Sequence, residues 1–307
     1  MLNKKLKVSI IGTGAIGGYY GIMLARMEQD VHFLLNSDYD YVKANGLKLQ
    51  SHLHNGINLP KVNAYNKATD MPVSDIVLVC LKTVQNHTVL ASVLPEVTDE
   101  NSLVILVQNG LGMEEDLSAA FPSLQIAGAV AMIGARKEKN GVIIHNDYGS
   151  IDFGSYNVKN LAPLKQLSSM FNFNQRSSSL QNLAYLRWKK LVWNMAFNGL
   201  SVLLNTTTDQ IISLHLDHCK TIMHEVINGA SACGVKLPLS FADDLIAFTK
   251  KMGDYAPSMK VDFDRSLPLE LEYMYNKPIL AARNMGYEMT VTNQLYMDLL
   301  EIDKSLR

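Results

Sequence analysis

The stretch that decides the fold is KVSIIGTGAIG, at residues 7–17. Residues 7–11 are rich in β-branched and apolar side chains and predict a buried strand, and residues 16–27 carry an apolar helical pattern. A second strand is predicted at residues 31–35. A strand, a glycine-rich turn, a helix and a second strand in this order predict a βαβ unit with two parallel strands.

The turn between the first strand and the helix has the pattern G-x-G-x-x-G. In this context Gly12 permits the tight turn, Gly14 lets the backbone approach a pyrophosphate, and Gly17 lets the helix pack close to the strand. The helix N-terminus offers N–H groups and a partial positive charge to the phosphates. A glycine-rich turn without a ligand is the alternative, which the flanking strand and helix disfavour. The predicted dinucleotide contacts are Gly12, Thr13, Gly14, Ala15, Ile16 and Gly17.

The rest of the first half alternates short apolar runs with helical patterns. Continuous apolar runs at residues 76–81 and 103–107 predict strands that are covered on both faces, as in a parallel sheet. Further strands are predicted, in chain order, at residues 47–50, 57–59, 125–131, 142–145 and 151–153. This alternation predicts the α/β class, with a Rossmann-type doubly wound sheet.

The pattern changes after about residue 180, near a possible linker at Ser177, Ser178 and Ser179. Long helical patterns follow at residues 182–204, 209–233, 241–252 and 268–285. We therefore predict two domains, a dinucleotide-binding domain at residues 1–181 and an all-helical substrate and catalytic domain at residues 182–307. This agrees with a prior of about 150 residues per domain.

Composition excludes several classes of function. The 28 basic and 29 acidic residues give a formal charge of −1, which leaves no basic excess to neutralise a nucleic-acid backbone. No apolar run approaches the roughly 18 residues of a spanning helix. The three cysteines show no CxxC spacing, so we expect neither a disulfide framework nor an oxidising compartment. We therefore expect a cytoplasmic protein that binds neither nucleic acid nor a membrane.

The end of the second predicted strand bears on the choice of dinucleotide. An NAD-type fold usually places an acid there to bind the ribose 2′-hydroxyl, and this chain has Asn36. Asn36 and Ser37 can donate hydrogen bonds to a 2′-phosphate, and Lys82, after the strand at 76–81, can add positive charge. The alternative is that Lys82 is only a solvated lysine. The pattern favours NADP(H) over NAD.

Asn109 follows the predicted strand at 103–107, where ligands of open α/β sheets lie. It is therefore placed to meet the nicotinamide half of the dinucleotide. Asn109-Gly110 is also an ordinary turn dipeptide, and position alone does not separate the two interpretations.

Polar side chains form a stripe on the predicted helix at 182–204. Lys190, Asn194 and Asn198 are spaced four residues apart and share one face, among largely apolar neighbours. Such a stripe is costly when buried unless a polar ligand satisfies it, and the alternative is that it faces water. Either Glu270 or Glu272, which cannot share a helix face, can supply a carboxylate partner for the lysine.

Two smaller features complete the candidate set. Ser258 and Met259, placed in a loop before the helix at 268–285, can bind a carboxylate through hydroxyl and backbone N–H groups. One further predicted helix carries a cluster of possible metal ligands, namely His215, His218, Cys219 and His224. That cluster lacks a clean ligand spacing, so we favour a solvated helix surface and expect no metal site.

Taken together, these motifs make the sequence resemble the ketopantoate reductase (2-dehydropantoate 2-reductase) family over nearly its whole length. The residues that carry the resemblance are Gly12-x-Gly14-x-x-Gly17, Leu81-Lys82, Gln108-Asn109-Gly110, Trp188-Lys189-Lys190-Leu191-x-x-Asn194-x-x-x-Asn198, Ser258-Met259 and Glu270. The glycine motif is shared with many dehydrogenases, whereas the lysine–asparagine helix is much more specific.

The resemblance implies an NADP-dependent oxidoreductase that reduces 2-dehydropantoate to (R)-pantoate on the route to pantothenate and coenzyme A. It implies a Rossmann domain, a helical domain similar to that of 6-phosphogluconate dehydrogenase, and an active site in the cleft between them. The implied proton donor is Lys190, and the implied catalytic partner is Glu270. The implied cofactor contacts beyond the glycine turn are Lys82, Asn109, Ala135 and Glu270, to which the strand-end argument above adds Asn36. The implied substrate contacts are Asn109, Lys190, Asn194, Asn198 and Ser258.

The sequence departs from the family pattern at two places. Asn36 stands where the family often carries arginine, and Thr208 stands where a further substrate-binding asparagine is expected. The expected partner is a small-molecule 2-keto acid, and a homodimer is the assembly that we consider. Two other functions stay open: a reductase of another branched 2-keto acid or imine, and a non-catalytic NADP(H)-binding redox sensor.

Overall fold

The computed structural model describes residues 5–171 and 180–306, so the possible linker at Ser177–Ser179 lies outside the described residues. The chain divides into two compact units. The first unit comprises Met1–Gln108 and Glu114–Leu183, and the second comprises Asn109–Met113 and Ala184–Arg307.

Ten strands of the first unit form one mixed sheet in the described part of the chain, in the order β4-β3-β9-β8-β7-β6-β1-β2-β5, with β10 paired to β9. The strands are β1 (Lys7–Ile11), β2 (Asp30–Leu34), β3 (Leu47–Ser51), β4 (Ile57–Leu59), β5 (Asn63–Tyr65), β6 (Ile76–Val79), β7 (Leu103–Leu106), β8 (Gln125–Lys137), β9 (Val142–Ser155) and β10 (Leu180–Asn182). β1 pairs in parallel with β2 and β6, and β7 with β6 and β8. Every residue of β6 and β7 is buried, as their continuous apolar runs require. The α/β class predicted from the sequence is confirmed.

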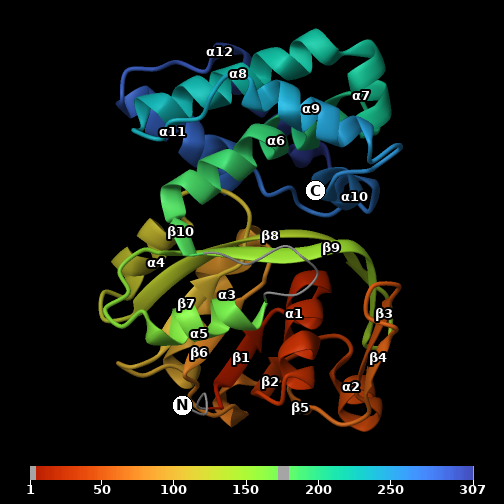
Figure 1. The fold of residues 1–307 in the computed structure, drawn as a ribbon, viewed down its shortest axis with the longest axis vertical. Helices are drawn as coiled ribbons and strands as arrows, with labels where there is room; N and C mark the ends of the chain where they lie inside the picture. The colour runs from red at the N-terminus through yellow and green to blue at the C-terminus, as the bar shows by residue number, and fades with distance from the viewer. Residues whose placement is uncertain (1–4, 172–179, 307) are drawn as a thin grey trace. The chain divides into compact units, whose positions relative to one another are not determined.

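Helices cover this sheet. They are α1 (Ala15–Arg26), α2 (Tyr39–Asn45), α3 (Asn86–Val97), α4 (Met113–Ala120) and α5 (Ala162–Met170), with short 3₁₀ turns η1 (Ala68–Asp70) and η2 (Thr83–Gln85). α1 lies against β1, β2, β3, β8 and β9 (Figure 1). Its glycines allow this close approach, since a Cβ on Gly21 would lie 2.3 Å from the Phe33 ring.

Two differences from the predicted sheet concern its antiparallel part. The runs at 142–145 and 151–153 belong to one strand, β9, which pairs with β8 in antiparallel fashion through two register shifts (Figure 1). β8 is also longer than predicted and ends at Lys137. The sequence missed this continuity because the residues between the two runs, which include Asn146 and Asp147, are polar and partly exposed.

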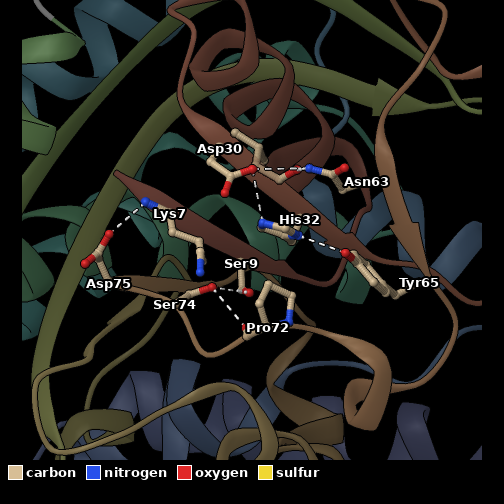
Figure 2. A network of polar contacts seen from close by, with 10 residues as sticks. Lys7, Ser9, Asp30, His32, Asn63, Tyr65, Pro72, Ser74 and Asp75 are labelled. Atoms are coloured by element: carbon tan, nitrogen blue, oxygen red, sulfur yellow. Dashed lines mark hydrogen bonds and ion pairs between the residues drawn. The ribbon is translucent and has the colours of Figure 1, made fainter. Parts of the chain in front are cut away.

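A network of polar contacts joins β1 and β2 to their neighbours in the first unit (Figure 2). The His32 ring lies between β2 and β5, with Nδ1 3.1 Å from the Tyr65 hydroxyl and Nε2 3.2 Å from Asp30 Oδ1. The Ser9 and Ser74 hydroxyls are 2.9 Å apart, so β1 is joined to the segment before β6. The contacts satisfy the buried Ser9 hydroxyl and His32 Nδ1. The buried His32 Nε2 has only the contact with the Asp30 carboxylate and makes no hydrogen bond to the described residues.

The described part of the second unit is helical and has its own core. Its helices are α6 (Leu183–Leu203), α7 (Thr208–Leu214), α8 (Leu216–Ala232), α9 (Phe241–Lys250), α10 (Ser258–Asp264), a π-helical turn η3 (Glu272–Asn276), α11 (Lys277–Asn284) and α12 (Thr290–Ser305). α6 supplies many core side chains, among them Trp188, Val192, Phe197 and Leu200, each at most 2% exposed.

The prediction of a single helix at residues 209–233 is wrong, because the structure has two helices there, α7 and α8. His215 has φ −132° and ψ 26°, so it closes α7 and begins α8. Its N–H donates to the Ile211 carbonyl, and its carbonyl accepts from the Cys219 N–H. A one-residue break of this kind leaves the apolar periodicity nearly intact, so the sequence pattern did not reveal it.

Ser258 and Met259 begin helix α10, and the prediction that they lie in a loop is wrong. α12 also lies where the sequence pattern predicted no helix. Both helices start where a side chain from another helix accepts their N–H groups: Asn198 of α6 accepts from Met259, and Glu225 of α8 accepts from Val291 and Thr292. Such caps come from tertiary contacts, so no local start signal accompanies them.

Replacing Glu225 with alanine should lower the free energy of unfolding by about 2 kcal/mol, because the α12 N-terminus loses charge-assisted hydrogen bonds from two backbone N–H groups and the Thr292 hydroxyl. Urea unfolding followed by circular dichroism measures this. The control is Glu301→Ala, which removes an exposed pair with Lys304 and should change stability by less than about 0.5 kcal/mol. Equal effects of the two substitutions would contradict the capping role.

Candidate functional site

The glycine-rich turn of the first unit has the shape that the sequence predicted. Gly12 has φ +94°, and a Cβ there would lie 2.8 Å from the Leu81 backbone nitrogen. A Cβ on Gly17 would lie 2.3 Å from the Gly12 carbonyl oxygen. Gly14 differs, because a Cβ there would meet no atom within 4 Å. Gly12 and Gly17 are therefore required by packing, and Gly14 borders open space.

The N-terminus of α1 follows this turn and is free of side-chain caps. The helix begins at Ala15, after Gly14 in the N-cap position, and its first turn contains no acidic residue. The Gly14 N–H donates to the Gly12 carbonyl, and the Thr13 hydroxyl donates to the Leu34 carbonyl at 2.9 Å, which ties the turn to the end of β2. Ala15 and Ile16 thus begin an uncapped helix at the open side of the turn, and a dinucleotide pyrophosphate fits this arrangement.

The other predicted cofactor contacts of the first unit follow the ends of parallel strands. Asn36 lies two residues beyond β2 and is exposed, and Lys82 lies beyond β6 at the start of η2 and is also exposed. Because β1, β2 and β6 are parallel, both residues lie at the edge of the sheet where the glycine turn lies. Ala135 is half-buried in β8, opposite His145 of β9, next to a register shift.

A buried amide pair that the sequence analysis did not single out joins two of these strand ends. Asn86 Nδ2 donates to Gln108 Oε1 at 3.1 Å, and Gln108 Nε2 donates to Asn86 Oδ1 at 2.6 Å. Gln108 Nε2 also donates to the Leu81 carbonyl. The pair therefore links the Leu81 backbone, just before Lys82, to Gln108, just before Asn109. Gln108 belongs to the quoted motif, whereas no local pattern marks Asn86.

Asn109 follows β7 in the chain, but the segment Asn109–Met113 belongs to the second unit. The Leu111 N–H donates to the Tyr273 carbonyl at 2.9 Å. Gly110 has φ +116°, and a Cβ there would lie 2.5 Å from the same carbonyl oxygen. The half-buried Asn109 is therefore held beside the η3 turn of the second unit.

The lysine–asparagine stripe on α6 is only partly satisfied by protein contacts. Asn198 is 1% exposed, and its Oδ1 accepts from the Met259 N–H at 3.0 Å and from the Ser258 hydroxyl at 3.4 Å. The structure thus brings Asn198 and Ser258 together. Asn194 is 3% exposed, and its side chain makes no hydrogen bond to any residue within 5–171 or 180–306. A buried amide without a protein partner is suited to a polar ligand.

Lys190 lies one turn before Asn194 and is half-buried. Its Nζ is 5.9 Å from the centroid of the Trp193 ring, and it forms no ion pair with the described residues. Burial lowers the pKa of Lys190 to about 8, because the ammonium loses hydration that no carboxylate replaces. An amine with such a pKa can donate a proton near neutral pH.

Of the two predicted carboxylate partners, the structure buries only Glu270, at 7% exposure. Glu272 is exposed and accepts from Asn276 Nδ2 at 2.9 Å. Glu270 stands two residues before the π-helical turn η3 (Glu272–Asn276), and π-helical turns are frequent at functional sites.

Thr208, which stands where the family pattern has an asparagine, is fully buried. Its hydroxyl lies 3.1 Å from the Tyr255 carbonyl oxygen and 3.2 Å from that of Gly253. The threonine therefore anchors the loop that leads to Ser258, and its side chain is already occupied.

The possible metal ligands of residues 215–224 do not form a cluster, since the described residues contain no group of three His, Cys, Asp or Glu side chains that could hold a metal ion. None of the described helices is both long and apolar enough to cross a membrane.

The comparisons with known proteins agree with the resemblance. Family models match residues 8–158, as ketopantoate reductase PanE/ApbA, and residues 182–302, as its C-terminal part. A 2-dehydropantoate 2-reductase of Nostoc sp. (strain PCC 7120) is 40% identical over 97% of this chain and 95% of its own length. The crystal structure of 2-dehydropantoate 2-reductase from Geobacter metallireducens has a TM-score of 0.91 at 33% identity, over 96% of this chain and 99% of that one. A dimeric ketopantoate reductase from Staphylococcus aureus shares the fold, with a TM-score of 0.80 at 20% identity over 98% of this chain and 100% of that one.

The two asparagines of the stripe should respond differently to substitution by leucine, which has a similar size. Asn198→Leu should lower the free energy of unfolding by about 1–3 kcal/mol, because the Met259 N–H is left buried without an acceptor. Asn194→Leu should leave stability unchanged or raise it, because no hydrogen bond is lost. Urea unfolding of both variants measures the difference. Equal destabilisation would mean that Asn194 has a structural role.

Proposed function

Because this chain belongs to the ketopantoate reductase family, we propose that it catalyses the NADPH-dependent reduction of 2-dehydropantoate to (R)-pantoate, in pantothenate and coenzyme A biosynthesis. The observation that carries the proposal is the α6 stripe, in which Lys190, with a pKa of about 8, precedes Asn194, a buried amide without a hydrogen-bond partner among the described residues. The family models and the 40% identical 2-dehydropantoate 2-reductase support the same reaction.

The first unit supplies the groups that would hold the dinucleotide. The open turn at Gly14 and the uncapped first turn of α1 suit a pyrophosphate, and Asn36 and Lys82 follow the strand ends where the adenosine half lies in this fold. Bound NADPH supplies the hydride that a 2-keto acid needs at its ketone carbon. We assign Asn109, Ala135 and Glu270 to the reacting end of the cofactor, as the family resemblance implies.

The second unit supplies the groups that would hold and protonate the substrate. The Lys190 ammonium would donate a hydrogen bond to the ketone oxygen and then give it a proton as negative charge develops there. Asn194 and Asn198 would bind the substrate hydroxyl or carboxylate, and the Ser258 hydroxyl would bind the carboxylate. Asn198 already orients Ser258 through its Oδ1. The buried Glu270 carboxylate would position Lys190 or a substrate hydroxyl.

One observation favours a second substrate within the same reaction class. The Thr208 side chain is engaged by the carbonyls of residues 253 and 255, so the chain lacks one amide that the family pattern provides. Another branched 2-keto acid, or an imine, is therefore the alternative. We further propose a cytoplasmic homodimer, for which the dimeric reductase of Staphylococcus aureus is the precedent.

A panel of 2-keto acids with NADPH and NADH, followed by the loss of reduced-nicotinamide absorbance, tests the proposal. We expect the largest kcat/KM for 2-dehydropantoate with NADPH. A larger kcat/KM for another keto acid or an imine would establish the alternative substrate. Tight NADPH binding without turnover of any panel member would instead point to a redox sensor and remove the enzyme assignment.

The pH dependence of kcat/KM should show the ionisation of Lys190. The lysine must be protonated to act as the acid, so log kcat/KM should fall with a slope of −1 as pH rises through about 8, the pKa to which burial lowers this amine. Lys190→Ala should lower kcat by about 10²–10⁴ and abolish that limb of the profile. Circular dichroism checks that the variant is folded. A near-normal kcat in a folded variant would remove Lys190 from the mechanism.

A further inference from the structure

We infer that Lys137, at the end of β8, is the residue that selects the 2′-phosphorylated dinucleotide in this protein. The inference rests on the proposed function, and it assigns a specificity role to a residue that the glycine motif and the strand-end positions do not include. The cation that the family often carries at the end of β2 is missing here, and the structure brings another to the same region from a distant part of the chain.

The contacts of the Lys137 ammonium place it at the glycine turn. Nζ donates to the Thr13 carbonyl at 2.6 Å and lies 2.7 Å from Asp38 Oδ2. Thr13 is part of the turn that would meet the pyrophosphate, and its own hydroxyl reaches the end of β2. Asp38 lies in the segment that follows β2, next to Asn36 and Ser37. Lys137 therefore lies where the glycine turn and the end of β2 converge, which is where the adenosine ribose binds in this fold.

The length of β8 is what brings this lysine to the site. Leu103–Leu106 of β7 pair with Gln125–Gly128 of β8 in parallel, so residues 129–137 of β8 continue beyond the carboxyl end of β7. The turn after β1 and the end of β2 lie at that edge of the sheet, because β1, β2, β6 and β7 are all parallel. Thr13 and Lys137 are 124 residues apart in sequence, so no local motif joins them.

Next to residues 36–38, the local charge favours a phosphate only while Lys137 is present. Residues 36–38 contain no base, and the Asp38 side chain is only 12% exposed, so its carboxylate would repel a 2′-phosphate. Lys137 neutralises that carboxylate. Its ammonium has three N–H donors; among the described residues it donates a hydrogen bond to the Thr13 carbonyl and forms an ion pair with Asp38. The side chain is 25% exposed, so a donor remains available to a phosphate oxygen.

Binding measurements with NADPH and NADH on the whole chain test this, using dinucleotide fluorescence to obtain Kd for each. Lys137→Met should weaken NADPH by about 10- to 100-fold and change NADH by less than about 3-fold. Lys137→Arg should keep the preference for NADPH. Asp38→Asn should raise the NADPH preference severalfold, because the phosphate then no longer meets a carboxylate. Competition by 2′,5′-ADP and by 5′-ADP should show the same pattern, independent of turnover.

The matched control is Arg136→Met, on the same strand. Arg136 is exposed and pairs with Glu138, so its loss should leave both Kd values unchanged. If Lys137→Met weakens NADPH and NADH equally, the lysine only holds the glycine turn and the inference is overturned. If wild type binds NADPH and Lys137→Met keeps the wild-type preference, the inference is overturned while the proposed function stands. A wild-type chain that binds neither dinucleotide overturns the proposed function, and the inference with it.

Discussion

The close approach of helix α1 to strand β1 is the constraint on which the rest of the first unit depends. A Cβ on Gly17 would lie 2.3 Å from the Gly12 carbonyl oxygen, so only glycine lets the helix begin directly above the strand end. The close packing at Gly17 fixes the position of the uncapped N-terminus of α1. It also determines which neighbouring strand ends can contribute to the same site, since β2 and β6 run parallel to β1 on either side. The phosphate-binding geometry is therefore a consequence of packing at two glycines.

The second unit shows a different balance between stability and function. α6 supplies many side chains of a helical core, yet it also buries Asn194 and half-buries Lys190. Burying either group lowers the free energy of unfolding, because an amide without a protein partner and a dehydrated ammonium are each less favourable in a core than an apolar side chain. Asn198 shows the contrasting case, since its Oδ1 caps α10 and orients Ser258. One stripe of three residues thus combines an amide that protein donors satisfy with an amide and an amine that form no hydrogen bond or ion pair with the described residues.

Much of the fold and of the candidate site was predictable because the governing interactions are local. The strand at residues 7–11 and the glycine turn appear where the periodicity of the sequence places them, and the family resemblance is confirmed by the comparisons. The errors at α10 and α12 share one physical cause. α10 and α12 begin at N–H groups that are accepted by Asn198 and Glu225, side chains of other helices, and the sequence around their starts carries no matching signal.

The sequence by itself determined the α/β class, the glycine turn, the helical second half and the residues of the α6 stripe, because backbone propensity, apolar periodicity and i, i+4 spacing are properties of short segments. Only the tertiary structure decided which of these groups are satisfied. It paired Asn86 with Gln108, left Asn194 without a protein partner in the described chain, and carried Lys137 along β8 to the Thr13 carbonyl. Burial and charge pairing depend on contacts between residues as far apart in sequence as Thr13 and Lys137, and a linear pattern does not contain them.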